Sequence, residues 1–179
     1  LISNANYGIN IFGKNDDEGI GTPFSTEISG CSFVNKSGSE LSLAVYAANS
    51  SNLLIMNNTV SSSNLIKGFA QGIYTEFCSG GNVNFIGNTI NSTGNGMTLI
   101  NSSPFVSQNI INGNQYSETG IFLDNSNGKF EYNVINDFYY SFYSMLSSPD
   151  LLKNIFDNSY AENIYLTYSS APNLKPVSS

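Results

Sequence analysis

The sequence has no arginine, no histidine and no tryptophan, and lysine supplies all 6 of its basic residues. A protein that binds nucleic acid needs a basic face to neutralise phosphates, and an anionic membrane surface attracts clusters of lysine or arginine. The net charge of -7 argues against both classes of partner. No apolar run approaches the roughly 20 residues that a membrane-spanning helix needs. We therefore expect neither nucleic-acid binding nor membrane insertion.

Charge is scarce overall, at 11% of residues against roughly 25% in ordinary soluble domains. Asparagine (27 residues) and serine (28 residues) take the polar positions instead. Hydrophobic residues make up 40% of the chain and aromatic residues 13%, enough for a continuous core at this length. The composition predicts one folded domain.

Cysteine is also scarce, with Cys31 and Cys78 as its two copies. They fall at different points of the repeat described next, so stacking of the repeats does not bring them together. A disulfide and two free thiols both stay open, and two cysteines do not settle the redox compartment.

One short motif recurs along the chain: an apolar residue, two residues, asparagine, one residue and a second apolar residue. An earlier, degenerate copy has Cys31 in place of the asparagine. A second motif, glycine followed by an apolar residue, opens short alternating runs at Gly8, Gly72, Gly96 and Gly120. Repeats of roughly 20–50 residues indicate a solenoid. The five complete copies of the first motif centre on Asn58, Asn88, Asn109, Asn133 and Asn154, at spacings of 30, 21, 24 and 21 residues.

The segments between the polar clusters are predicted to be strands. They are only three to five residues long, whereas helices need roughly ten residues or more. They are rich in β-branched and aromatic residues and are bounded by asparagine, serine or glycine. Three short strands per repeat of 22 to 24 residues predict an all-β fold, a right-handed parallel β-helix of about seven coils.

The repeated asparagine has a mechanical role in this fold. A sharp bend between two strands needs a residue in the left-handed αL conformation, which asparagine tolerates better than any residue except glycine. Stacked asparagine side chains also hydrogen-bond from coil to coil as a ladder. We interpret the five repeated asparagines as structural and expect both features at each of them.

Columns of apolar residues then form the core, because each coil of a solenoid buries its apolar side chains against its neighbours. One predicted column is Ile55, Phe85, Val106, Phe130 and Leu151. A second is Phe33, Val60, Ile90, Ile111, Ile135 and Phe156. A third is Ile9, Leu43, Ile73, Met97, Ile121, Phe142 and Ile164.

These repeats resemble those of right-handed parallel β-helix proteins of the pectin-lyase-like superfamily, over roughly residues 7 to 168. That superfamily includes polysaccharide lyases and hydrolases, phage tailspikes and surface proteins of bacteria. The resemblance implies the fold and leaves the activity open.

The β-helix is predicted to occupy residues 1–168, and residues 169–179, with Pro172 and Pro176, a linker or tail. Because the chain opens inside the pattern, we expect a fragment of a longer protein whose neighbouring domains cover its ends. Architecture and composition favour a location outside the cell or on its surface. Residues 13–26, 61–71 and 112–119 interrupt the period and are predicted to be loops.

Candidate catalytic residues are few. Pectate-lyase-like enzymes use an arginine base and polygalacturonase-like enzymes a histidine motif, and this sequence has neither residue type. The best remaining acid–base pair is Glu76 and Asp124, two coils and so roughly 10 Å apart. Inverting glycosidases separate their carboxyls by roughly 6.5–9.5 Å. We favour two exposed acids at strand ends, and expect no turnover of pectin, polygalacturonate, alginate or neutral β-glucans.

Metal binding has one weak candidate. The carboxylates of Asp16, Asp17 and Glu18 lie in the first loop and could hold Ca²⁺ through oxygen ligands. They lack the ligand spacing of an EF-hand, so we favour a solvated loop. No cofactor is predicted.

Strand alternation predicts what the outer surface displays. An aromatic row suits stacking on the apolar faces of sugar rings, and the alternative is that the rings stack on one another or cover a partner surface. Thr98 interrupts the row and is predicted to leave a slot between Tyr74 and Phe122. The predicted row is Tyr46, Tyr74, Phe122, Tyr143 and Tyr165. A second outward row, suited to packing against another chain or domain, is Thr59, Thr89, Ile110, Val134 and Ile155.

Three hypotheses for function follow. The leading one is a non-catalytic β-helix module of the extracellular space or cell surface, stalk-like or adhesin-like, that binds glycans. The alternative is a polysaccharide lyase or glycoside hydrolase, or a fragment of one. The third is a structural spacer. Because the sequence offers few candidate catalytic acids and bases, a binding role or a structural spacer role is favoured over catalysis.

Overall fold

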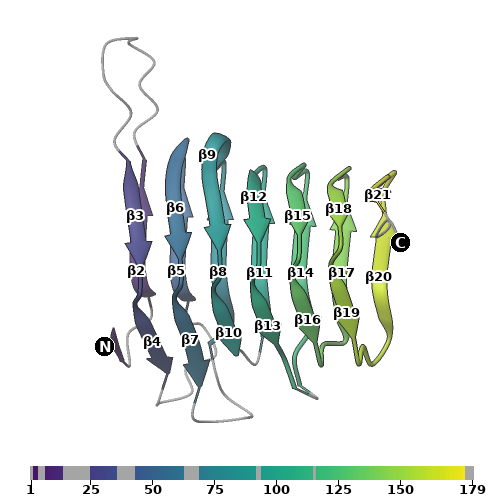
Figure 1. The fold of residues 1–179 in the computed structure, drawn as a ribbon, viewed down its shortest axis with the longest axis horizontal. Coiled ribbons are helices and arrows are strands. Elements are labelled where there is room, and N and C mark those ends of the chain that lie inside the picture. Colours follow the sequence, from purple (N-terminus) through teal and green to yellow (C-terminus); the bar gives the residue numbers. More distant parts are fainter. Residues whose placement is uncertain are drawn as a thin grey trace.

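The computed structural model describes residues 2–3, 7–13, 25–35, 43–62, 69–91, 94–114 and 116–175. These residues form three parallel sheets of seven strands each (Figure 1). Sheet A contains β1 (Ile2–Ser3), β4 (Ser32–Asn35), β7 (Thr59–Ser62), β10 (Thr89–Asn91), β13 (Ile110–Asn112), β16 (Val134–Asn136) and β19 (Ile155–Asp157). Sheet B contains β2 (Tyr7–Phe12), β5 (Leu43–Ala48), β8 (Gln71–Glu76), β11 (Asn95–Ile100), β14 (Thr119–Asp124), β17 (Tyr140–Met145) and β20 (Glu162–Thr167). Sheet C contains β3 (Thr26–Ser29), β6 (Asn52–Met56), β9 (Ser79–Ile86), β12 (Ser103–Ser107), β15 (Lys129–Glu131), β18 (Asp150–Leu152) and β21 (Asn173–Lys175).

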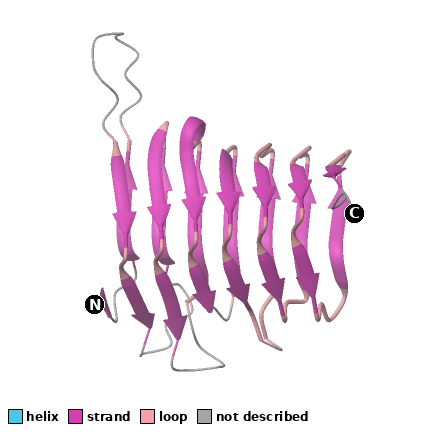
Figure 2. Cartoon of the chain, in the orientation of Figure 1, coloured by secondary structure: helices cyan, strands magenta, loops and turns pink. Residues whose placement is uncertain are grey.

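The sheets wind into a parallel β-solenoid of about six turns, close to the predicted seven. Each strand pairs in parallel with the equivalent strand of the next coil, as β11 does with β14. Figure 2 shows strands joined by short connections along the whole described chain, which confirms the predicted all-β fold. In this part of the chain, no helix is long and apolar enough to cross a membrane.

The predicted core columns in sheets C and A are confirmed pair by pair. The third column, in sheet B, needs one correction. Val45, and not Leu43, pairs with both Ile9 and Ile73. Leu43 and Val45 are two residues apart and share one face of the strand, so the alternation pattern cannot distinguish the two registers. The core therefore differs from the prediction by a slip of two residues in one strand.

The bend between sheets C and A takes two residues, and the left-handed residue is the first of them. Positive φ angles occur at Asn57 (54°), Gly87 (65°), Gln108 (57°), Tyr132 (56°) and Lys153 (53°). The repeated asparagine that follows each of these residues has no positive φ. The prediction that Asn58, Asn88, Asn109, Asn133 and Asn154 adopt αL is therefore wrong. Their side chains must point inward to reach the neighbouring coils, so the preceding residue makes the reversal.

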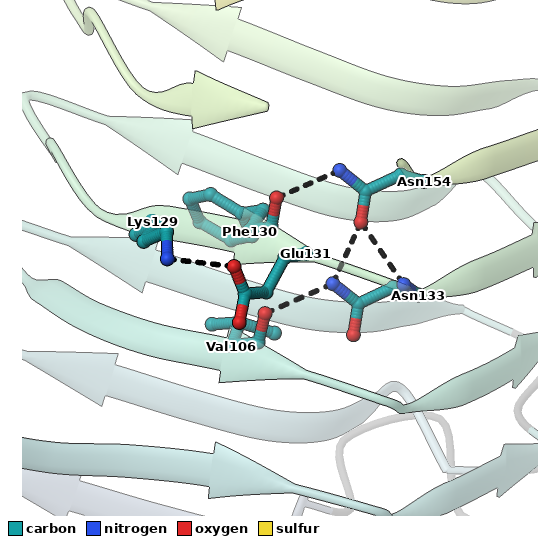
Figure 3. Close-up of polar contacts among 6 residues, drawn as sticks. All are labelled: Val106, Lys129, Phe130, Glu131, Asn133 and Asn154. Carbon is teal, nitrogen blue, oxygen red and sulfur yellow. Dashed lines mark hydrogen bonds and ion pairs between the residues drawn. The ribbon is translucent and has the colours of Figure 1, made fainter. Parts of the chain in front are cut away.

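The predicted asparagine ladder is confirmed. The Oδ1 atom of Asn109 accepts hydrogen bonds from the backbone N–H and the Nδ2 of Asn88, both at 2.9 Å. The Nδ2 of Asn109 donates to Oδ1 of Asn133 and to the carbonyl of Phe85, both at 2.9 Å. Figure 3 shows the same pattern one coil further on, between Asn133 and Asn154. The ladder therefore satisfies buried backbone groups as well as the amides themselves.

A second ladder, built from serine, lines the bend between sheets B and C. The backbone N–H of Ser102 donates to Ser126 Oγ at 3.0 Å, and that of Ser126 donates to Ser147 Oγ at 2.8 Å. Cys78 occupies the same column, where its N–H donates to Ser102 Oγ. Cys31 lies in the asparagine column. The thiols of Cys31 and Cys78 are both free. Burial raises the pKa of the Cys78 thiol. Serine is so frequent in this sequence that the serine column cannot be recognised from the sequence alone.

Replacing Cys31 by asparagine is expected to stabilise the protein by about 0.5–1.5 kcal/mol. The backbone N–H of Cys31 donates to Asn58 Oδ1 at 2.9 Å, but its thiol cannot supply the amide donor that Asn58 supplies to Asn88. An asparagine at position 31 adds that bond. Urea unfolding measures the gain, with Cys31→Ser as the control of similar size. Equal stability of the two variants would show that the ladder cannot be extended here.

The β-solenoid continues beyond residue 168. Strand β21 pairs with β18 and places Leu174 beside Leu151. Ser170 also joins the serine ladder by accepting a hydrogen bond from the N–H of Ser147. The predicted linker over 169–179 is therefore wrong for residues 173–175. This last copy was missed because no asparagine follows its apolar residue at the expected spacing.

Candidate functional site

The outward face of sheet B carries the five predicted aromatic residues in one row. Strand pairing places Tyr46 beside Tyr74. It also places Phe122 beside Tyr143, and Tyr143 beside Tyr165. All five side chains are partly exposed. The structure thus brings these residues together on one face, along the axis of the solenoid.

The rings of this row pack on one another. The centroids of Tyr46 and Tyr74 are 5.6 Å apart with planes inclined by 28°, and those of Phe122 and Tyr143 are 5.2 Å apart with planes inclined by 88°. Thr98 pairs with both Tyr74 and Phe122 and is only 4% exposed. The predicted slot at Thr98 is therefore closed, and part of the ring surface is used within the row.

The two predicted carboxylates lie on the same face, with Ile100 of β11 between them in register. Glu76 accepts hydrogen bonds from the hydroxyls of Tyr74 (2.7 Å) and Tyr46 (3.1 Å). Burial, followed by the hydrogen bond and charge of Glu76, raises the pKa of Tyr74. Because each oxygen of Glu76 accepts a hydrogen bond from a tyrosine hydroxyl, Glu76 positions Tyr46 and Tyr74. Asp124 lies two strands away.

A pocket of about 420 Å³, which the sequence analysis did not predict, opens beside the C-terminal half of the row. Tyr139 is 52% exposed, and its ring meets that of Tyr140 edge to face, with centroids 4.8 Å apart and planes at 89°. Tyr140 and Tyr143 are inclined by 64° at 5.6 Å. This tyrosine pocket is lined by Tyr116, Ser117, Glu118, Thr119, Tyr139, Tyr140 and Tyr143. Its size is within the roughly 300–1,000 Å³ of small-molecule sites.

Backbone hydrogen bonds fix the connections that form this pocket. The N–H of Asn114 donates to Ser117 Oγ, and the N–H of Ser117 donates back to the Asn114 carbonyl, which closes a tight turn. The N–H groups of Tyr139 and Tyr140 donate to the carbonyls of Ser117 and Glu118 in the preceding coil. Two successive connections are thereby bonded together. The predicted loop at 112–119 and the Tyr139–Tyr140 pair were the signals in the sequence.

A second pocket, of about 460 Å³, lies over sheet C between Gly80 and Asp150. Glycine and serine form much of its lining, and Phe105 is its one aromatic residue. Lys129 in this pocket forms an ion pair with Glu131 at 2.6 Å, drawn in Figure 3. The pocket therefore offers little apolar ring surface to a ligand.

The remaining predicted sites fall outside this face. In the outward row of sheet A, Ile110 is 44% and Ile155 is 57% exposed. The loop with Asp16, Asp17 and Glu18 lies outside the described residues. Among the residues that are described, no group of three or more cysteine or acidic side chains is arranged to hold a metal ion.

No family model matches the chain, and comparisons with curated proteins and with solved structures also found no match.

Proposed function

We propose that the chain is a non-catalytic β-helix module that binds carbohydrate on the outward face of sheet B. The observation that carries this proposal is the tyrosine pocket beside the aromatic row. Tyrosine rings supply apolar surface for the faces of sugar rings and hydroxyls for hydrogen bonds. Ligand sites combine such apolar lining with a few polar groups, as the exposed carboxylate of Glu118 provides here.

The proposed setting is a stalk or adhesin-like segment outside the cell or on its surface. A solenoid whose coils pack only on their neighbours forms an extended, stiff element, which suits this role. The resemblance to the pectin-lyase-like superfamily, which includes polysaccharide enzymes, supports a carbohydrate ligand by analogy. Catalysis ranks lower because Glu76, one member of the candidate acid–base pair, is engaged by two tyrosine hydroxyls.

Alanine at Tyr139 is expected to weaken glycan binding about 5–30-fold, through loss of about 1–2 kcal/mol of ring contact. A glycan array identifies ligands, and isothermal titration calorimetry measures their affinity for both proteins. Tyr132→Ala is the matched control, because Tyr132 is similarly exposed (47%) but lies at the bend after sheet C.

Three results would contradict the proposal. The first is that no glycan binds the folded protein. The second is that Tyr132→Ala and Tyr139→Ala weaken binding equally. The third is turnover of pectin, polygalacturonate, alginate or a β-glucan that disappears in Glu76→Gln or Asp124→Asn, which would establish the enzymatic alternative.

A further inference from the structure

The ring arrangement in the tyrosine pocket is suited to a positive charge. Tyr139, Tyr140 and Tyr143 meet at steep angles, so that ring faces and ring edges both contribute to the walls. Tyr140 is held in place from the other side by stacking on Tyr165, with centroids 4.9 Å apart and planes inclined by 18°. The face of an aromatic ring carries negative potential and attracts ammonium groups within about 6 Å of its centroid.

The charged side chains around the pocket are negative. Glu118 is exposed and is the one charged residue among those that line the pocket. Glu162 pairs in register with Tyr140 at the next coil. Loss of hydration is the largest cause that raises the pKa of Tyr140, and the charge of Glu162 is among the smaller causes that act in the same direction. The wall and rim of the pocket are therefore electronegative.

The lysines whose side chains the structure describes lie elsewhere. Lys129 pairs with Glu131 in sheet C. Lys153 lies over the ring of Tyr132, 5.4 Å from its centroid, at the bend after sheet C. An anionic sugar in the pocket would lie close to the Glu118 carboxylate. Repulsion between the two negative charges would strongly disfavour its binding.

We infer that the tyrosine pocket binds a glycan bearing free amino groups, in preference to neutral or uronic acid glycans. This inference rests on the proposed function and names its ligand class. The apolar face of the sugar ring packs on tyrosine, and the protonated amine lies between the tyrosine rings and the Glu118 carboxylate. A charge-assisted hydrogen bond and a cation–π contact then act on one group of the ligand.

The test uses two ligands that share one backbone and differ in charge, together with an anionic ligand of a different backbone. A fully deacetylated glucosamine tetramer is compared by calorimetry with its N-acetylated counterpart, and a galacturonate tetramer gives the anionic case. The deacetylated tetramer is expected to bind roughly ten-fold or more tightly than the N-acetylated one, and the galacturonate tetramer not to bind in the pocket. Tetramethylammonium is added as a probe with no sugar ring, and is expected to compete only weakly.

Glu118→Gln is the decisive variant because it keeps the shape of the side chain and removes the charge. It is expected to abolish the preference for the deacetylated tetramer, because the variant loses much more affinity for that tetramer than for the N-acetylated one. Glu27→Gln is the matched control, since Glu27 is an exposed acid on β3 of sheet C. Circular dichroism verifies that both variants are folded.

Three results would overturn the inference. The N-acetylated or galacturonate tetramer could bind at least as tightly as the deacetylated one, with Tyr139→Ala abolishing that binding. The proposed function would then still hold. Glu118→Gln and Glu27→Gln could have equal effects. Tetramethylammonium could bind as tightly as the amino sugar, which would assign the pocket to an ammonium group alone. Absence of binding by every glycan would instead overturn the proposed function.

Discussion

Replacing Asn109 by leucine is expected to lower the free energy of unfolding by about 3–6 kcal/mol, since each buried polar group left unpaired costs about 1–3 kcal/mol. Asn109 is completely buried in the middle of the ladder. Leucine removes the acceptor of the N–H and Nδ2 of Asn88. It also removes the donor to Asn133 Oδ1 and to the carbonyls of Phe85 and Ser107. Leucine is similar in size, so the loss reflects hydrogen bonding more than packing.

The neighbouring residue supplies a control that separates the ladder from the bend. Gln108 is exposed with a φ of 57°, and glycine accepts that conformation without strain. Gln108→Gly is therefore expected to change stability by less than about 1 kcal/mol, because relief of αL strain offsets the greater freedom of the unfolded chain. Asn109→Gly is expected to cost nearly as much as Asn109→Leu.

The measurement is urea unfolding followed by far-UV circular dichroism, because the chain has no tryptophan to report by fluorescence. Repeat arrays do not always unfold in one cooperative step. Hydrogen exchange of the Asn88 and Asn109 amides therefore gives a second, local measure. If glycine were harmless at 109 and costly at 108, the asparagine would be the bend residue and the ladder would contribute little.

The sequence predicts the architecture because the repeat encodes it directly. Regular spacing of apolar residues and of asparagine fixes three strands per coil and the stacking of like on like. The αL position was assigned one residue too late because its occupants share no chemistry: Gly87, Gln108 and Lys153 all fill it. The fold imposes the αL conformation at this exposed position whatever residue occupies it. Only the buried ladder position shows a repeated residue type that can be recognised in the sequence.

The candidate site was predictable only in part. Alternation along sheet B placed Tyr74, Phe122 and Tyr143 on one face, since this depends on strand geometry alone. Whether the rings lie open or pack on one another depends on their side-chain rotamers, and no periodicity encodes these. Tyr116 and Tyr139 lie in connections between sheets, outside the repeat, so the pocket that they line could not be derived from the period of the strands.

Replacing Gly96 by alanine is expected to destabilise the protein by about 2–4 kcal/mol through overpacking. A Cβ atom at this position would lie 2.3 Å from Cγ2 of Ile111 and 2.5 Å from the carbonyl oxygen of Gly120. Gly96 has no positive φ, so the substitution tests space and not conformational freedom. The glycine that opens this strand therefore lets β11 approach both the core of sheet A and the backbone of the next coil.

Gly81→Ala is the matched control, because a Cβ atom there meets nothing within 4 Å. Alanine also restricts the unfolded chain, so this variant is expected to be neutral or slightly more stable. In Gly96→Ala, adding Ile111→Leu moves the branch away from Cβ and should recover part of the loss, while the contact with the Gly120 carbonyl persists. Thermal and urea unfolding of the three variants measure these differences. Equal stability of Gly96→Ala and Gly81→Ala would mean that the coils separate readily at this point, and the close approach of β11 to β14 would not be a constraint on the fold.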